Sequence, residues 1–155
     1  MGQRHFPETK EELNKLVEDL NINLGDIDTC LITNMSWLFS STERTDFSGI
    51  ESWDTSNVTN MACMFYKAKH FNENINAWNV SKVKDMSCMF ADATHFNQNI
   101  SSWNVSKVEN MSYMFSYAEN FNQPLDKWDT SSVELMRGMF GGSPLQNNPP
   151  KWYKP

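Results

Sequence analysis

Cysteine and histidine residues recur at a fixed spacing in this chain and are the first candidates for chemistry. Cys63 and Cys88 lie 25 residues apart, and so do His70 and His95. Thiolate and imidazole groups are common zinc ligands. However, the chain contains no Cys-x-x-Cys or His-x-x-x-His spacing, and a further 25 residues on the two positions hold tyrosine and asparagine. We therefore expect no metal site and interpret both cysteines as free thiols.

Paired carboxylates would be the next candidates, as a general acid and base. Asp54 and Asp129 occupy equivalent positions in the chain but are three 25-residue periods apart. If successive periods stack at roughly 5 Å per layer, these two groups are too distant for one active site. The chain also lacks a nucleophile elbow, a phosphate loop and a zinc-protease helix. We expect no enzyme and no cofactor.

A 25-residue repeat organises the residues around these positions. Trp53, Trp78, Trp103 and Trp128 mark its step, and two methionine columns and one phenylalanine column follow it: Met61, Met86, Met111 and Met136; Met64, Met89, Met114 and Met139; Phe65, Phe90, Phe115 and Phe140. A period of this length is typical of stacked-repeat proteins, in which each unit buries its apolar face against its neighbours. We expect the methionine columns to fill the core between layers.

Composition excludes several classes of function. The 155 residues have a net charge of −6, which argues against nucleic-acid binding, since that requires clustered lysine and arginine. No run approaches the roughly 18 apolar residues of a membrane helix. The first residues lack the apolar region of a secretory signal.

The two ends of the chain differ from the repeats. Thr9-Lys-Glu-Glu12 is a capping box, followed by an apolar stripe of helical spacing, and Gly25 is a plausible stop. Residues 1–27 are therefore predicted to be an N-terminal cap with an amphipathic helix. Residues 28–140 form the repeat region, whose first repeat is degenerate. Residues 141–155, which contain a displaced copy of the tryptophan column at Trp152, are predicted to be a C-terminal cap or tail.

Two apolar periods alternate inside each repeat. Trp78 and Val80 are two apart, which predicts a short strand with Asn79 facing outward. The residues from Val83 to Ala93 have the spacing of two helical turns. Serine stands at the helix start, and two further repeats have explicit capping boxes, Ser106-Lys-Val-Glu109 and Ser131-Ser-Val-Glu134. The predicted fold class is therefore α/β, a solenoid of short strands and short helices with an N-terminal capping helix.

The outward strand positions are the predicted ligand-binding face. They form one column, Asp54, Asn79, Asn104 and Asp129, with a neighbouring column that includes Ser102 and Lys127. Small polar groups at fixed intervals make a flat, acidic, hydrogen-bonding surface of the kind through which repeat proteins bind partners. Alternatively, these residues only keep the strand face soluble and satisfy turns. A further column, Asn72, Asn97 and Asn122, is expected to hydrogen-bond neighbouring loops through its side-chain amides.

The pattern Trp-[Asp/Asn]-[Val/Thr]-Ser-x-Val-x-x-Met-x-x-Met-Phe resembles the repeat of BspA-like leucine-rich repeat proteins, and more closely a related bacterial surface-protein repeat family of unknown function. The resemblance covers roughly residues 28–140. It implies a right-handed leucine-rich-repeat-like solenoid, surface exposure or secretion, and adhesion or host-protein binding. It carries over no catalytic residues.

The sequence thus predicts a non-catalytic protein-binding module that presents a rigid face to a protein partner. The alternative is a structural or assembly spacer, inside the cell or within a larger protein. Neither the partner nor the oligomeric state is specified by the residues.

Overall fold

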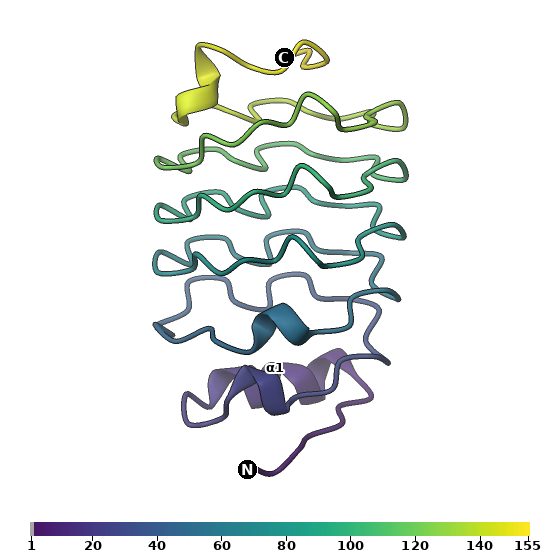
Figure 1. The fold of residues 1–155 in the computed structure, drawn as a ribbon, viewed down its shortest axis with the longest axis vertical. Coiled ribbons are helices and arrows are strands. Elements are labelled where there is room, and N and C mark those ends of the chain that lie inside the picture. Colours follow the sequence, from purple (N-terminus) through teal and green to yellow (C-terminus); the bar gives the residue numbers. More distant parts are fainter. Residues whose placement is uncertain (1) are drawn as a thin grey trace.

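The computed structural model describes residues 2–155, and the chain in it winds as a stack of similar coils (Figure 1). The first coil lies beside the helix α1 (Lys10–Glu18), and the last lies under the C-terminal tail. Three short 3-10 helices, η1 (Leu24–Asp26), η2 (Ile50–Ser52) and η3 (Pro144–Gln146), complete the regular elements. Everything else between these elements consists of turns and extended links.

Helix α1 begins where the capping box predicts and ends earlier than expected. The Thr9 hydroxyl accepts the Glu12 N–H at 3.2 Å, while the Glu12 carboxylate accepts the N–H of Glu8, one residue before the cap. Leu13 and Val17 are buried against the first coil. The helix stops at Glu18, so Gly25 is not its end but part of η1.

The predicted α/β architecture, a right-handed leucine-rich-repeat-like solenoid of short strands and short helices, is wrong. Residues 2–155 contain the single α-helix α1 and no sheet, and their parallel pairing is confined to isolated bridges such as Asn60 to Asp85. The stretch from Val83 to Ala93 is a series of turns, not a helix. The capping boxes at Ser106 and Ser131 cap no helix either.

Positive backbone φ angles explain why the helical spacing of the apolar residues does not produce a helix in each repeat. In each coil two residues four positions apart adopt the left-handed conformation, as do Cys63 (φ 57°) and Lys67 (φ 58°). These residues alternate with tight turns, such as the bond from the Met64 N–H to the Met61 carbonyl. The resulting ribbon still places the buried side chains of one coil at i, i+3, i+4 and i+7, the spacing that also marks a helix face.

A ladder of backbone hydrogen bonds joins successive coils along this ribbon. At each of the four steps between the five coils, four N–H groups of the earlier coil donate to carbonyls of the later one, over 2.7–2.9 Å. The step from the second coil to the third is representative: the N–H groups of Met61, Cys63, Phe65 and Lys67 donate to Asp85, Ser87, Met89 and Ala91. One or two bonds per step run the opposite way, as from the Lys84 N–H to the Thr59 carbonyl.

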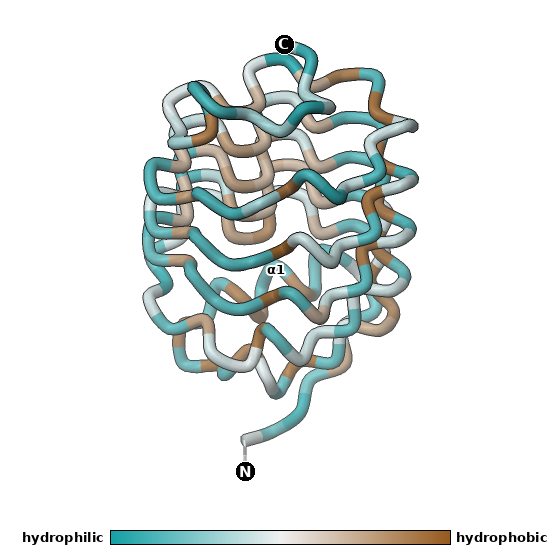
Figure 2. Tube along the Cα trace, turned by 45° about the horizontal axis from the view of Figure 1, so that its top comes forward, coloured by the Kyte–Doolittle hydropathy of each residue, from teal (hydrophilic) through white to brown (hydrophobic). Residues whose placement is uncertain are grey.

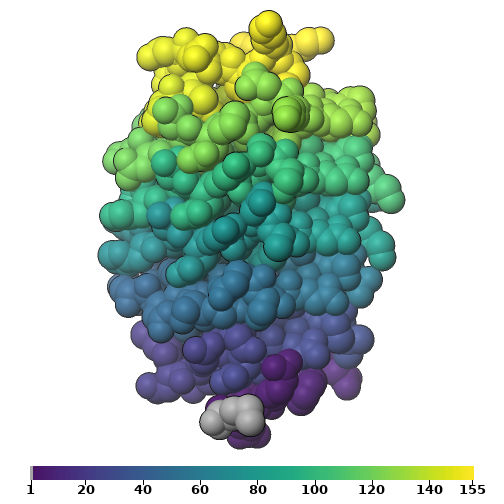
Figure 3. Space-filling model, viewed as in Figure 1, coloured from purple at the N-terminus to yellow at the C-terminus, as the bar shows by residue number. Residues whose placement is uncertain are grey.

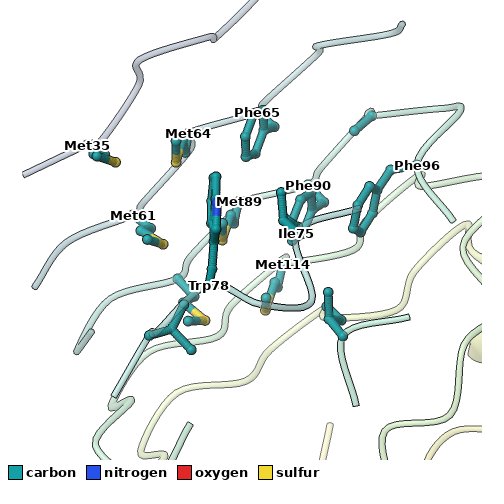
Figure 4. Close-up of a cluster of buried hydrophobic side chains, with 14 of the residues drawn as sticks. Met35, Met61, Met64, Phe65, Ile75, Trp78, Met89, Phe90, Phe96 and Met114 are labelled. Atoms are coloured by element: carbon teal, nitrogen blue, oxygen red, sulfur yellow. The ribbon is translucent and has the colours of Figure 1, made fainter. Parts of the chain in front are cut away.

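The core is a continuous set of aromatic and thioether columns inside the stack. Apolar residues recur at the same places in successive coils (Figure 2), and methionines from neighbouring coils pack beside the phenylalanine rings (Figure 4). Rings of Phe65, Phe90 and Phe115 stack with centroids 5.6 Å apart. Met61, Met86 and Met111 are fully buried, which confirms the methionine columns as core.

Each tryptophan of the 25-residue column, Trp53, Trp78, Trp103 and Trp128, also donates a buried hydrogen bond to a carbonyl 28 or 29 residues earlier. The indole N–H of Trp78 donates to the Ile50 carbonyl at 3.2 Å, and that of Trp103 to the Ile75 carbonyl at 3.1 Å. Trp152 repeats this contact with the Leu125 carbonyl at 2.8 Å and stacks on Trp128 with centroids 6.3 Å apart. Its assignment as a displaced member of the tryptophan column is therefore confirmed.

Candidate functional site

The four residues of the predicted binding column lie on the surface, but not on a strand. Asp54, Asn79, Asn104 and Asp129 are all exposed. Each side-chain oxygen accepts the N–H of the residue two positions on, as Asn79 does from Ser81 at 3.0 Å and Asn104 from Ser106 at 3.1 Å. This is the Asx-turn geometry, in which a side chain substitutes for a backbone acceptor. The column therefore has a structural role in turning the chain after each buried tryptophan.

These turns lower the pKa of the two aspartates of the column. Hydrogen bonds from the Ser56 hydroxyl and N–H lower the pKa of the Asp54 carboxyl. The Ser131 side chain and N–H lower the pKa of Asp129 in the same way. A carboxylate that is held charged and exposed suits hydrogen bonding to a partner, whereas a general acid at neutral pH needs a raised pKa.

The neighbouring column offers less than predicted. The Ser102 hydroxyl donates to the side-chain oxygen of Asn76 at 2.5 Å, so it links two coils. Lys127 is exposed. The asparagine column behaves as expected: Asn72 accepts the Asn97 N–H at 2.9 Å, and Asn97 accepts the Asn122 N–H at 3.0 Å. These hydrogen bonds connect the loops of successive coils.

A second surface, which the sequence analysis missed, carries exposed aromatic side chains in two groups, one on the first two coils and one on the fourth. We call it the aromatic turn face and define it by Trp37, Tyr66, Tyr113 and Tyr117. Trp37, Tyr113 and Tyr117 are 57%, 41% and 58% exposed. All three are left-handed residues of the turn ribbon, so their columns run up one side of the stack. Tryptophan and tyrosine do not favour positive φ, so their residue type could not predict this conformation. Only Gly138 and Gly142, which continue the same columns, are of a type that favours it.

The aromatic turn face has fixed geometry. Trp37 and Tyr66 meet edge to face with centroids 6.0 Å apart, and the Lys67 ammonium lies 5.2 Å from the Tyr66 ring centre. The rings of Tyr113 and Tyr117 lie over the following coil. A Cβ atom at Gly138 would come within 2.4 Å of the Tyr113 ring, so glycine makes room for it.

Cys63 lies beside Cys88, and His70 lies beside His95, each pair in one column of the stack. Neither pair forms a metal or catalytic site. Cys63 is buried and Cys88 is partly buried, and both thiols are free. Burial raises the pKa of Cys63 to about 12 and raises that of Cys88, which makes both poor nucleophiles. His70 and His95 stack with centroids 6.0 Å apart. Within residues 2–155 no three His, Cys, Asp or Glu side chains are grouped so that they could hold a metal ion.

No helix between residues 2 and 155 is long and apolar enough to span a membrane. No curated protein matches the chain, and no solved structure does. A protein family described as Mycoplasma protein of unknown function, DUF285, matches residues 33–152. This range runs from the first coil to the tryptophan of the tail and so contains both the Asx-turn column and the aromatic turn face. Since it is more than half of the sequence, the chain belongs to the DUF285 family.

Proposed function

We propose that this chain is a non-catalytic protein-binding module and that the aromatic turn face is its principal contact surface. The observation that carries the proposal is the exposure of Trp37, Tyr113 and Tyr117 on one side of a rigid stack. Tryptophan and tyrosine dominate the energetics of protein interfaces, because they bury a large area at low entropic cost. A backbone tied by four ladder bonds per step loses little further freedom on association.

The Asx-turn column is the weaker candidate for the same function. One oxygen of each side chain is already engaged within its own turn, as at Asn79 and Asn104. The outward amide N–H groups and the second carboxylate oxygens remain for a partner. From the resemblance to bacterial surface-protein repeats, we propose a host protein or another surface protein as the partner. A structural spacer is the competing function.

Paired variants test the two surfaces against each other. The full chain is used as bait in a pull-down from a soluble extract of host cells. Binding is then measured again with the purified partner. We expect the double substitution Tyr113→Ser with Tyr117→Ser to abolish binding of the purified partner. The matched control, Asn79→Arg with Asn104→Arg, should leave it intact.

The opposite pattern would move binding to the Asx-turn column. Binding that survives both double substitutions and also Trp37→Ser, with folding intact by calorimetry, would contradict recognition through either surface. A chain that retains no specific partner in any extract would support the spacer.

A further inference from the structure

We propose that the C-terminal end of the stack is a docking edge for an extended, acidic segment of a partner protein, which adds to the ladder as a further coil would. This edge adjoins the aromatic turn face at Gly138, which lies against the Tyr113 ring, but it uses backbone N–H groups and does not depend on that face. The contacts would be backbone hydrogen bonds along the last coil, supported by an apolar contact and by opposite charge.

The last coil has ladder donors without acceptors. The N–H groups of Met111, Tyr113, Phe115 and Tyr117 in the fourth coil all donate to the fifth. Their counterparts in the fifth coil are Met136, Gly138, Phe140 and Gly142. Of these, only the Gly142 N–H has an acceptor within residues 2–155, the Gln146 side-chain oxygen at 2.7 Å. Gln146 thus occupies the place of one carbonyl of a following coil.

The tail covers only part of this end. Trp152 and Tyr153 pack on the Phe140 ring, with the Tyr153 ring centre 5.0 Å away. In the space-filling side view the C-terminal residues sit on the end of the stack, beyond the last coil (Figure 3). The tail also reaches Met136, whose sulfur accepts the Lys154 N–H at 3.2 Å, but Met136 and Gly138 remain partly exposed, and neither backbone N–H has an acceptor within residues 2–155.

The open part of the edge is also apolar where other coils are not. Val83 and Val108 are fully buried by the coil above, whereas the equivalent Val133 is only partly buried. Leu135 is 55% exposed and occupies a column that holds Asn60, Asp85 and Asn110 in the preceding coils. An added segment with an aliphatic side chain at this point would cover both residues.

Charge selects the partner. Residues 128–155, the last coil and the tail, contain Arg137, Lys151 and Lys154 against Asp129 and Glu134, and all five side chains are exposed. The whole chain has a net charge of −6, whereas this end has an excess of one positive side chain. An acidic segment would be attracted here, and its carboxylates could pair with the Arg137 guanidinium.

A second copy of this chain fits the edge poorly. Its ladder segments are already paired within its own stack, and α1 lies beside its first coil. A peptide in an extended conformation has free carbonyls at every second residue. It could therefore accept from Met136 and Gly138 at the interstrand spacing of about 4.8 Å.

Amide exchange and chemical shifts measured by NMR on the full chain test the proposal. The probe is an end-blocked synthetic octapeptide, Glu-Val-Glu-Asp-Met-Glu-Tyr-Glu, and its control carries lysine in place of every acidic residue. In the free protein we expect the Met136 and Gly138 amides to exchange at least about tenfold faster than those of Met111 and Tyr113. The acidic peptide should shift these two amides and slow their exchange.

Matched substitutions locate the effect. Leu135→Glu should weaken the affinity for the acidic peptide by about tenfold or more. Leu31→Glu changes a leucine of similar exposure, 58%, in the first coil and should leave affinity unchanged. Four results would overturn the proposal. The first two are that the Met136 and Gly138 amides are already protected in the free chain, or that the peptide shifts only residues of the aromatic turn face. The other two are that the lysine peptide binds equally well, or that raising the protein concentration alone gives the same shifts, which would assign the edge to a second copy.

Discussion

Replacing Met111 by alanine probes the stacked core most directly, because the same column offers an internal comparison. Met111 is fully buried between two neighbouring coils, whereas Met136 lies in the last coil and is only partly buried. Met111→Ala removes three heavy atoms from contact with the core, worth about 2.4 kcal/mol at about 0.8 kcal/mol per methylene-sized group. A residual cavity of roughly 60 Å³ adds about 1.4 kcal/mol.

The expected loss for Met111→Ala is therefore about 4 kcal/mol, within the usual range of roughly 2–5 kcal/mol for such truncations. Met136→Ala should cost less than about half as much, because no coil covers that side chain and the site can fill with water. Urea unfolding followed by tryptophan fluorescence measures both values, and an unchanged slope with denaturant confirms that the free energies are comparable. Calorimetry checks that the stack unfolds as one unit.

Two results would refute this reasoning. A loss below about 1 kcal/mol for Met111→Ala would show that the layers collapse onto the gap without cost. Equal losses at Met111 and Met136 would show that the next coil contributes nothing to the burial of this column, and the stacked arrangement would lose its energetic basis.

Three further predictions concern the turns and the thiols. Lys67→Gly should stabilise the chain by about 0.5–1 kcal/mol, because Lys67 has φ 58° and glycine adopts this conformation freely. The control Lys69→Gly changes a residue without positive φ and should destabilise the chain. Calorimetry measures both effects. Since the hydrogen bonds from Ser56 lower the pKa of Asp54, its stabilising effect is complete above the unfolded value of about 3.9 and is lost as pH falls through the folded pKa. Asp54→Asn keeps the turn and should flatten the dependence of the urea midpoint on pH between about 5 and 2. Asn79→Asp should steepen the same dependence. A profile that neither substitution changes would contradict the stabilising role of the ionised turn carboxylate. A thiol reagent at pH 8 should leave Cys63 unmodified in the native chain, because burial raises its pKa to about 12, and should modify all three cysteines in denaturant; fast native labelling of Cys63 would show that it is accessible.

The 25-residue period and the identity of the core could be predicted from the sequence, because burial depends on side-chain type. The tryptophans, methionines and phenylalanines of each column are apolar whatever the backbone does, and the structure buries them. The N-terminal helix could also be predicted, since Thr9 and Glu12 act locally. In these cases residue type and spacing are sufficient.

Local backbone geometry could not be predicted in the same way. The spacing from Met61 to Ala68 fits a helix and a turn ribbon equally well, and the decision depends on hydrogen bonds to a coil 25 residues away. Cys63 and Lys67 adopt positive φ although neither residue type favours it. The Asx-turn column was correctly predicted to be exposed, yet its side chains turned out to hold their own loops. The aromatic turn face was missed because its exposure follows from that unforeseen conformation.

The direction of the ladder gives the molecule an electrical polarity along its axis. Four peptide N–H groups at each step point toward the C-terminal end, and only one or two point the other way. Peptide dipoles aligned in this way add up, as they do in a helix. The end near residue 155 is therefore the positive pole and the end near α1 the negative pole, and every inserted repeat would lengthen the dipole. Near a negatively charged surface, such a molecule would stand with its last coil inward.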